Sequence, residues 1–424
     1  MIQRIIDFLF RPDFEQFARV NIVFYCACLC AGAFIGSGIA VFVISGAVFG
    51  IFHFYTGRLR WSLPNPVAAV YYTFCGLFAA ELISALIHPS MISLNEVIEN
   101  LPFLGFAAIY AITVVDRKSL LRNVERAAAW AAIVAAVILA FIFDVNYRPE
   151  LSAGNPSVLS LLAGILYVML AGAAIRRNDR MMLFYVAAAA CAAFVVIVTG
   201  TRSIWPALIL IPILGLFVIR PMRQALLGSV AMMVVLVGLA GIGVTFSETL
   251  QNRVSITTSD IQSSFSGDLS GPIGQRLQIY RAGYELFLEK PLLGYGPGNE
   301  RAEIARKTLE RGGSEVSFSH AHNVLLNVAL RAGTLGLLAF AALIIVPVVV
   351  VYRARRDDVA QAGFFILYGM LTVYLLAGAA GLMLGNDIHD AAFIAGVCYS
   401  LYLVFGRTPV GAEGSRSGPG IPAV

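Results

Sequence analysis

Long apolar runs recur along almost the whole chain, and they limit the folds that it can adopt. The first begins near residue 20 and the last ends near residue 406, with one long polar interval between residues 246 and 319. A helix that crosses a bilayer needs about 20 mainly apolar residues, and about twelve stretches approach that length. They are residues 20–36, 39–56, 66–87, 101–115, 127–144, 157–175, 181–199, 203–219, 226–245, 333–352, 360–384 and 389–406.

The composition supports the same fold class. Of the 424 residues, 59% are hydrophobic and 13% are charged, whereas a soluble domain carries roughly 25% charged residues. We therefore predict an all-α, polytopic membrane protein with about 12 transmembrane helices. The net charge of +5 is then no sign of a nucleic-acid partner, because its meaning depends on the side of the bilayer that the basic residues occupy.

The basic residues predict the orientation in the membrane. They gather in alternate connections between the apolar runs, whereas the intervening short connections hold only Arg148 and Arg202. Connections rich in Lys and Arg stay on the cytoplasmic side. Both termini are therefore expected in the cytoplasm, and the long polar interval is expected outside, in the periplasm of a two-membrane bacterium. The basic connections contain Arg58 and Arg60; Arg117, Lys118, Arg122 and Arg126; Arg176, Arg177 and Arg180; Arg220 and Arg223; Arg353, Arg355 and Arg356.

These patterns divide the chain into four parts. Residues 1–245 form an N-terminal membrane bundle of about nine helices, and 246–332 a periplasmic loop. Residues 333–406 form the C-terminal transmembrane helices, and 407–424 a Gly/Pro/Ser-rich disordered cytoplasmic tail. Met1–Arg19 is expected to be an amphipathic surface helix.

The periplasmic loop is expected to contain a helical hairpin. Ser255–Ser270 is rich in Ser, Thr, Asp and Gly and is typical of a loop. Apolar residues recur at helical spacing in Gln275–Lys290, and Asn299–Arg311 predicts a second, highly charged helix. Such a hairpin would lie over the outer face as a lid.

Two histidines, His320 and His322, lie where the polar interval meets an apolar run, followed by Asn323 and by Gly333 and Gly336. An imidazole changes charge near neutral pH, and two glycines one turn apart allow a close approach to the helix backbone. The alternative is a helix N-terminus with two incidental histidines.

Arginines on the same face indicate an anion. Arg202 lies in the small-residue turn Thr199–Ser203, and Arg276 begins the first loop helix, where a cation opposes the helix dipole. Arg281, five residues on, lies on another face of that helix. Both Arg202 and Arg276 are candidates for binding phosphate. Snorkelling for Arg202 and ordinary solvation for Arg276 remain the alternatives.

A second polar cluster, Gly385–Asp390, lies on the predicted outer face and contains Asp387, His389 and Asp390. His and Asp are metal ligands, but they serve equally well as a histidine base and the carboxylate that orients it. We predict no metal and no cofactor. Glu81, near the outer end of its span, either bonds a neighbouring helix or belongs to a polar pocket. The chain lacks a phosphate-binding G-x-x-x-x-G-K-[ST], a G-x-S-x-G elbow and an HExxH motif.

The polar motifs together resemble a known family. His322-Asn323, nine residues, Gly333, two residues and Gly336 is similar to the His-Asn-x9-Gly-x-x-Gly signature of O-antigen ligases, within the O-antigen ligase/polymerase superfamily. Gln275–Tyr280 and Pro291–Gly296 look like the loop before that histidine, and Thr199–Ser203 looks like the family's arginine-bearing turn.

The resemblance implies a metal-independent, inverting glycosyltransferase with a GT-C-like membrane fold. Its donor would be a glycan on undecaprenyl diphosphate, and its acceptor lipid A–core at the periplasmic face of the inner membrane. His322 would be the catalytic base, and Arg202 and Arg276 would bind the diphosphate. Further substrate-binding candidates are Arg281, Asn323, His320, Asp387 and Asp390.

Two other functions stay open. One is an O-antigen or exopolysaccharide polymerase of the same superfamily. The other is a secondary transporter, which would show inverted repeats and polar residues at mid-membrane, and neither pattern is visible in the sequence.

Overall fold

The chain is described from a computed structural model that covers residues 14–57, 63–142, 148–219, 221–246, 271–311 and 320–406, with positions 259, 262 and 266. Within these ranges every regular element is a helix and none is a strand. The predicted tail 407–424, most of the predicted loop Ser255–Ser270, and residues 1–13 of the predicted surface helix lie outside them. From Phe14 onward the N-terminal stretch is helical.

Eight helices are long and apolar enough to cross a membrane, and two shorter apolar helices accompany them in the described part of the chain. This confirms the prediction of an all-α polytopic membrane protein. The eight are α4 (Gly38–Tyr55), α5 (Asn65–Ile87), α8 (Arg117–Ile142), α9 (Pro156–Ile175), α10 (Met181–Val198), α16 (Val324–Ala354), α17 (Asp358–Ala379) and α18 (Asp387–Phe405). The other elements are α2 (Phe14–Cys30), α3 (Gly32–Ile35), α6 (Met91–Glu99), η1 (Leu101–Gly105), α7 (Phe106–Ala111), η2 (Leu151–Ala153), η3 (Arg202–Ile204), α11 (Trp205–Val218), α12 (Met222–Phe246), α14 (Pro272–Glu289) and α15 (Glu300–Glu310).

The predicted span 101–115 is not one regular helix. It consists of η1 and the six-residue α7, since Pro102 and Gly105 disfavour a continuous α-helix. The segment nevertheless runs back along α5. The ring of Phe103 lies 5.8 Å from that of Phe74, and the Val115 amide donates to the Tyr402 hydroxyl near the far end of α18 at 3.0 Å. The chain therefore still returns to the opposite end of the bundle at this point.

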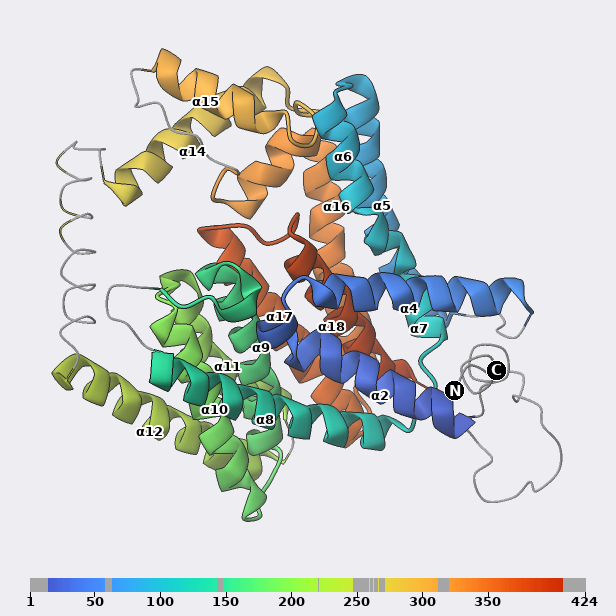
Figure 1. Ribbon diagram of the computed structural model, residues 1–424, viewed down its shortest axis with the longest axis vertical. Helices are drawn as coiled ribbons and strands as arrows, with labels where there is room; N and C mark the ends of the chain where they lie inside the picture. Colours follow the sequence, from blue (N-terminus) through green and yellow to red (C-terminus); the bar gives the residue numbers. More distant parts are fainter. Residues whose placement is uncertain are drawn as a thin grey trace.

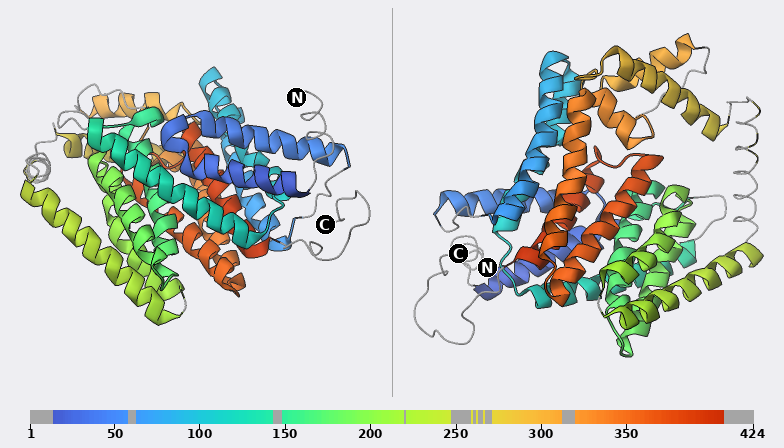
Figure 2. Two further views of the ribbon diagram at one scale, coloured as in Figure 1. Left: turned by 60° about the horizontal axis from the view of Figure 1, so that its bottom comes forward. Right: turned by 180° about the vertical axis from the view of Figure 1, so that it is seen from behind.

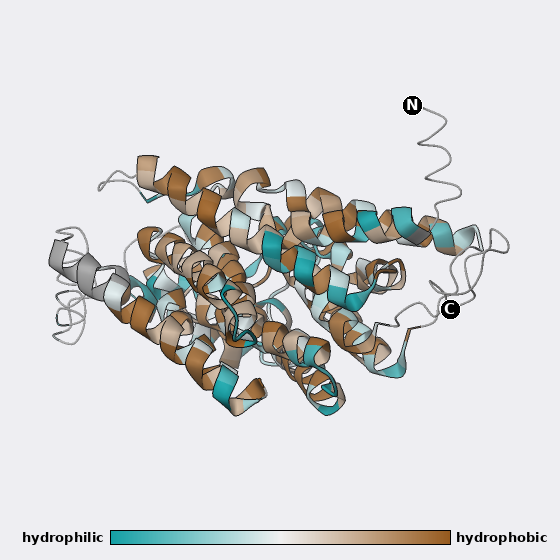
Figure 3. Cartoon of the chain, turned by 90° about the horizontal axis from the view of Figure 1, so that it is seen from below, coloured by the Kyte–Doolittle hydropathy of each residue, from teal (hydrophilic) through white to brown (hydrophobic). Residues whose placement is uncertain are grey.

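The core of the bundle is formed around α9. The apolar stretch of α9 that could cross a membrane is 100% buried inside the structure, whereas the corresponding stretch of α16 is 28% buried. α9 packs against α8, α10, α11, α12 and α17. The outer helices keep large apolar side chains exposed, and apolar stretches dominate the helices in Figure 3. Such an extended apolar exterior is expected where lipid rather than water is the solvent.

The helical hairpin lies at one end of the bundle, beside α6 and across the start of α16 (Figures 1 and 2). We call this the α15 end. Pro272–Glu289 and Glu300–Glu310 agree with the two predicted loop helices within a few residues. They share a small apolar core of their own, formed by Ile279, Leu286, Tyr295, Ile304, Ala321 and Leu330. This core joins the hairpin to the histidine loop and to α16.

Candidate functional site

The histidine loop is residues 320–323, and it leads directly into α16. Asn323 is the N-cap residue, and its side chain accepts a hydrogen bond from the Leu326 amide at 3.1 Å. This is the ordinary role of Asn before a helix. The side chain of Asn323 thus caps α16, and its role in substrate binding stays a prediction.

His322 has a left-handed backbone, with φ of 52°, which is uncommon and strained for a residue with a Cβ. The Tyr280 hydroxyl on α14 donates to the His322 carbonyl at 2.9 Å. The Ala321 amide donates to the Asn327 side chain at 3.5 Å. These bonds hold the loop so that the rings of His320 and His322 lie 4.2 Å apart, centroid to centroid.

Gly333 interrupts α16 one helical segment after the histidine loop. Its φ is 64°, and a Cβ there would lie 2.2 Å from the Leu292 carbonyl group. The predicted span from residue 333 therefore begins nine residues earlier, at Val324, with a kink between the two parts. The close approach that the glycine pair predicts is made here by residues 291–293 of the same chain.

The backbone groups that the kink frees are satisfied from outside the helix. The Thr334 amide donates to the Pro291 carbonyl at 2.8 Å, and the Tyr295 amide donates to the Leu330 carbonyl at 2.7 Å. Buried backbone groups without partners would be costly in an apolar bundle. The loop before α15 thus completes the hydrogen bonding of a membrane helix.

A polar cavity of about 210 Å³ opens beside the histidine loop at the α15 end. Of the predicted site residues, only His320 lines it; His322 is its neighbour through the ring contact. The lining residues are Glu300, Arg301, His320, Asn327, Arg331, Leu382, Gly385 and Asn386. The helices α15 and α16 therefore supply both signs of charge to this cavity, and two loops complete its wall.

Burial and neighbouring cations keep both histidines neutral. Burial, His322 and Arg301 are the first causes that lower the pKa of His320, to about 4. Burial and then Arg276 lower the pKa of His322. A neutral imidazole at pH 7 is able to accept a proton. Arg276 therefore lies within electrostatic reach of both histidines, and their shared role in binding an anionic substrate stays a prediction.

Glu300 is a carboxylate in this cavity that the sequence analysis does not identify. Its side chain is 1% exposed, and Oε2 has no hydrogen-bond partner in the described part of the chain. Burial raises its pKa to about 7, although Arg331 opposes the rise. An acid with a pKa near neutrality in a cavity is a recognised mark of a functional site.

Arg202 lies at the start of η3, and its side chain is exposed. η3 packs on α17, where Ile204 and Val373 both lie next to Gly164. Five residues further along α17, Gly378 lies against Val324 of the histidine loop's helix. The Arg202 turn and the histidine loop therefore both lie along the last turns of α17, while the meeting of Arg202 with Arg276 and His322 stays a prediction. Arg148, which the sequence analysis leaves aside, donates to the Thr199 carbonyl in that turn at 2.8 Å.

The remaining candidates differ in position. Arg281 and Asp387 are exposed. Asp390 is buried and accepts the Gly385 amide at 3.0 Å, so it shapes the loop that lines the cavity. His389 is buried beside Tyr374, and both ring nitrogens lack a hydrogen-bond partner among the described residues. Within the same ranges, no three His, Cys, Asp or Glu side chains are grouped as metal ligands.

A buried ion network around Arg331 supports the cavity. Arg331 is 5% exposed and donates to both oxygens of Glu81, each at 3.0 Å, and to Glu96 at 2.8 Å. Arg301 donates to the same Glu96 at 2.6 Å. The network joins α5, α6, α15 and α16. It decides between the alternatives for Glu81: this carboxylate bonds a neighbouring helix through Arg331 and does not line the cavity. Arg331 was visible in the sequence as an isolated charge inside an apolar run, the signal that marks a functional residue in a membrane helix.

The comparisons with known proteins concern the segment that contains this site. Residues 187–341 match the model of a protein family described as O-antigen ligase. A curated protein of Escherichia coli (strain K12), described as an O-antigen ligase, is 26% identical over 122 residues. That alignment covers 28% of the chain and 29% of the relative's length. The comparisons confirm the predicted resemblance to the O-antigen ligase superfamily, and Arg202, Arg276 and His322 all lie within residues 187–341.

Proposed function

We propose, from the match of residues 187–341 to the O-antigen ligase family, that this chain is a membrane glycosyltransferase that acts as an O-antigen ligase. It transfers O-polysaccharide from undecaprenyl diphosphate to lipid A–core. The observation that carries the proposal is the grouping of Arg276, His320 and His322 beside a polar cavity at one end of an apolar helical bundle. A lipid-linked substrate needs such a polar site within reach of the bilayer.

In the proposed reaction, His322 takes the proton of an acceptor hydroxyl. The acceptor oxygen then bonds to the anomeric carbon, and the bond from that carbon to the diphosphate breaks. The electron pair leaves with undecaprenyl diphosphate, and attack from the opposite side inverts the anomeric carbon. The lowered pKa of His322 supports this role, because the ring is in its proton-accepting form at pH 7.

The arginines bind the leaving group. Guanidinium groups match phosphate oxygens in pairs and stabilise the charge that develops on them without a metal ion. Arg276 already acts electrostatically on both histidines, and Arg202 would approach from the end of α17. The cavity of about 210 Å³ is smaller than the usual small-molecule site, so it holds only the reacting end of the substrate.

The proposed location is the bacterial inner membrane, with both termini in the cytoplasm and the α15 end in the periplasm. The alternation of basic connections supports this orientation. It places the candidate site on the side where the acceptor lipid A–core would be met.

The deciding experiment combines genetics with one substitution. A deletion strain should make core without O-chain and accumulate long lipid-linked polymer; core that carries a single repeat would instead indicate a polymerase. His322→Ala should fail to restore ligation while remaining folded and inserted. Restoration of ligation to the wild-type level by this variant would contradict the role of His322 as the base.

The arginine roles are tested in the same strain. Arg276→Lys and Arg202→Lys should each restore little ligation, because a point charge does not replace the paired donors of a guanidinium. Arg306→Lys is the comparison, since Arg306 is exposed on the neighbouring helix α15 and is not a candidate site residue. Near-normal activity of the Arg202 variant would favour the alternative that this side chain only snorkels toward water and binds no phosphate.

A further inference from the structure

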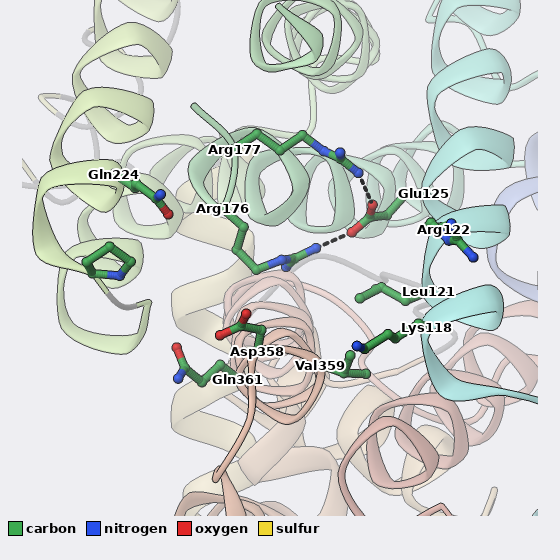
Figure 4. A pocket seen from close by; sticks show the side chains of 11 residues that line it. Lys118, Leu121, Arg122, Glu125, Arg176, Arg177, Gln224, Asp358, Val359 and Gln361 are labelled. Atoms are coloured by element: carbon green, nitrogen blue, oxygen red, sulfur yellow. Dashed lines mark hydrogen bonds and ion pairs between the residues drawn. The ribbon is translucent and has the colours of Figure 1, made fainter. Parts of the chain in front are cut away.

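A second cavity lies at the opposite end of α9 and α17 from the histidine loop. Its volume is about 510 Å³, within the range of small-molecule sites. The first turns of α8, α12 and α17 and the last turn of α9 surround it (Figure 4). The 22 residues of α17 separate it from the candidate active site by roughly 33 Å. It therefore has no part in the proposed transfer reaction.

The charged lining of this cavity is mainly cationic, with four basic side chains and two carboxylates. Glu125 is 2% exposed and accepts from both Arg176 and Arg177, so one carboxylate neutralises only one of two guanidiniums. Nη1 of Arg176 is buried without a hydrogen-bond partner in the described part of the chain. The full set of charged lining residues is Lys118, Arg122, Glu125, Arg176, Arg177 and Asp358.

The arginines are held in place before any ligand arrives. Figure 4 shows Arg176 and Arg177 turned toward Glu125 from one side of the cavity. The Arg177 guanidinium also lies 4.7 Å from the centre of the Tyr185 ring. Fixed side chains lose less conformational entropy on binding than free ones, so this arrangement favours an anion.

Three helix N-termini add to the positive potential. α8, α12 and α17 all begin at the cavity, and each N-terminus carries roughly half a positive charge with amide groups that point outward. Asp116 and Asp357 cap the N-termini of α8 and α17 through the Ser119 and Ala360 amides, and these carboxylates offset part of that potential. Arg176 and Arg177 offset the opposite charge at the end of α9.

The preference of basic residues for the cytoplasmic side does not by itself explain this arrangement. That preference is satisfied by cations spread over solvated connections. Here cations of α8 and α9 face one cavity together with three helix N-termini. We propose that this cavity binds a phosphate-bearing anion. Its place at the ends of apolar helices, level with lipid headgroups, fits the phosphodiester of an anionic lipid, and a soluble phosphate compound would use the same contacts.

Such an occupant would link four helices. It would bridge α8, α9, α12 and α17 through groups that otherwise repel one another, so occupancy should raise the thermal stability of the folded protein. The inference is independent of the proposed function, because no candidate catalytic residue lines this cavity.

The test uses the purified full-length chain in a neutral detergent, with the melting temperature as the readout. The probes are short-chain phosphatidylglycerol, the matching phosphatidylcholine and inorganic phosphate. Phosphatidylglycerol should raise the melting temperature of the wild type. In the double variant Lys118→Gln, Arg122→Gln, the same shift should require at least ten times more lipid.

Arg353→Gln is the matched control, since Arg353 is exposed at the end of α16 and does not line the cavity. It should respond as the wild type does. Gln224→Glu, which places a carboxylate in the cavity, is a second variant that should weaken the response if the double variant fails to fold. A response to lipid alone supports the headgroup as ligand, and a response to inorganic phosphate as well supports a soluble anion. No shift with either probe, or equal shifts in the wild type and the cavity variants, would overturn the proposal.

Discussion

His322 has the most constrained backbone in the candidate site. Its left-handed backbone costs on the order of 1–3 kcal/mol and persists because neighbouring groups fix it. The sequence predicts that this histidine is functional, but not its conformation, since the Tyr280 hydroxyl that accounts for it is 42 residues away along the chain.

Tyr280→Phe should therefore slow transfer while leaving substrate binding nearly unchanged. Losing one hydrogen bond of about 1 kcal/mol corresponds to a rate reduction of roughly fivefold if the bond positions His322 in the transition state. The check is kcat and KM for a lipid-linked donor. Tyr284→Phe is the control, because Tyr284 lies on the same helix and is 60% exposed. Equal effects of the two substitutions would contradict a positioning role.

Glu300 predicts a pH dependence of stability. Its pKa is raised to about 7 in the folded protein, above roughly 4.3 for an unfolded Glu. The folded state therefore binds the proton more tightly, so this contribution to stability is present below pH 4.3 and is lost as the pH rises through 7. It amounts to on the order of 3 kcal/mol.

Glu300→Gln cannot ionise and should flatten this dependence. Between pH 5 and pH 8, the melting temperature of the wild type should fall more steeply with rising pH than that of the variant. Glu303→Gln, on the same helix but partly exposed, should keep the wild-type slope. A Glu300→Gln protein with an unchanged slope would rule out the raised pKa.

At the scale of the helix, the sequence predicts where apolar segments lie better than how they are interrupted. Runs of about 20 apolar residues predict spans because the thickness of the bilayer fixes their length. The break in 101–115 and the start of α16 at Val324 depend on partners elsewhere, namely α5 and the loop before α15. Those partners could not be read from local periodicity.

Gly333→Ala should disrupt the kink and with it the folded protein. The new methyl group would lie 2.2 Å from the Leu292 carbonyl and would occupy a left-handed backbone position. Loss of folded protein, measured by gel filtration in detergent and by thermal unfolding, is the expected result. Gly76→Ala in α5 is the control, because nothing lies within 4 Å of its added Cβ. A stable Gly333→Ala protein would contradict the described kink.

Arg331 shows why the candidate site was only partly predictable. The sequence places Arg331 and Glu81 in separate apolar runs, 250 residues apart, and only the folded bundle pairs them. Arg331→Met would leave the buried Glu81 carboxylate without its cation, while Glu96 keeps Arg301, at a cost of about 3–5 kcal/mol. Thermal unfolding should show this loss, and adding Glu81→Gln to the same chain should recover part of it. No recovery would indicate that the pair is not coupled.

Over the whole molecule, the orientation in the membrane is open to a direct test. Asn178→Cys, between α9 and α10, and Tyr284→Cys, on α14, are exposed positions at opposite ends of the bundle. In intact spheroplasts, a maleimide that cannot cross membranes should label Tyr284→Cys and spare Asn178→Cys. Both should react after permeabilisation. The reverse pattern would invert the proposed orientation and place the histidines in the cytoplasm.

The backbone hydrogen bonds between residues 291–295 and α16 around Gly333 have a consequence for how the hairpin can evolve. Main-chain atoms of residues 291–295 fasten the hairpin to α16, and every amino acid except proline supplies the same donors and acceptors. The outward side chains of α14 and α15 are therefore not needed to attach the hairpin to α16. They can change to suit a different glycan while the hairpin stays fixed above the histidines.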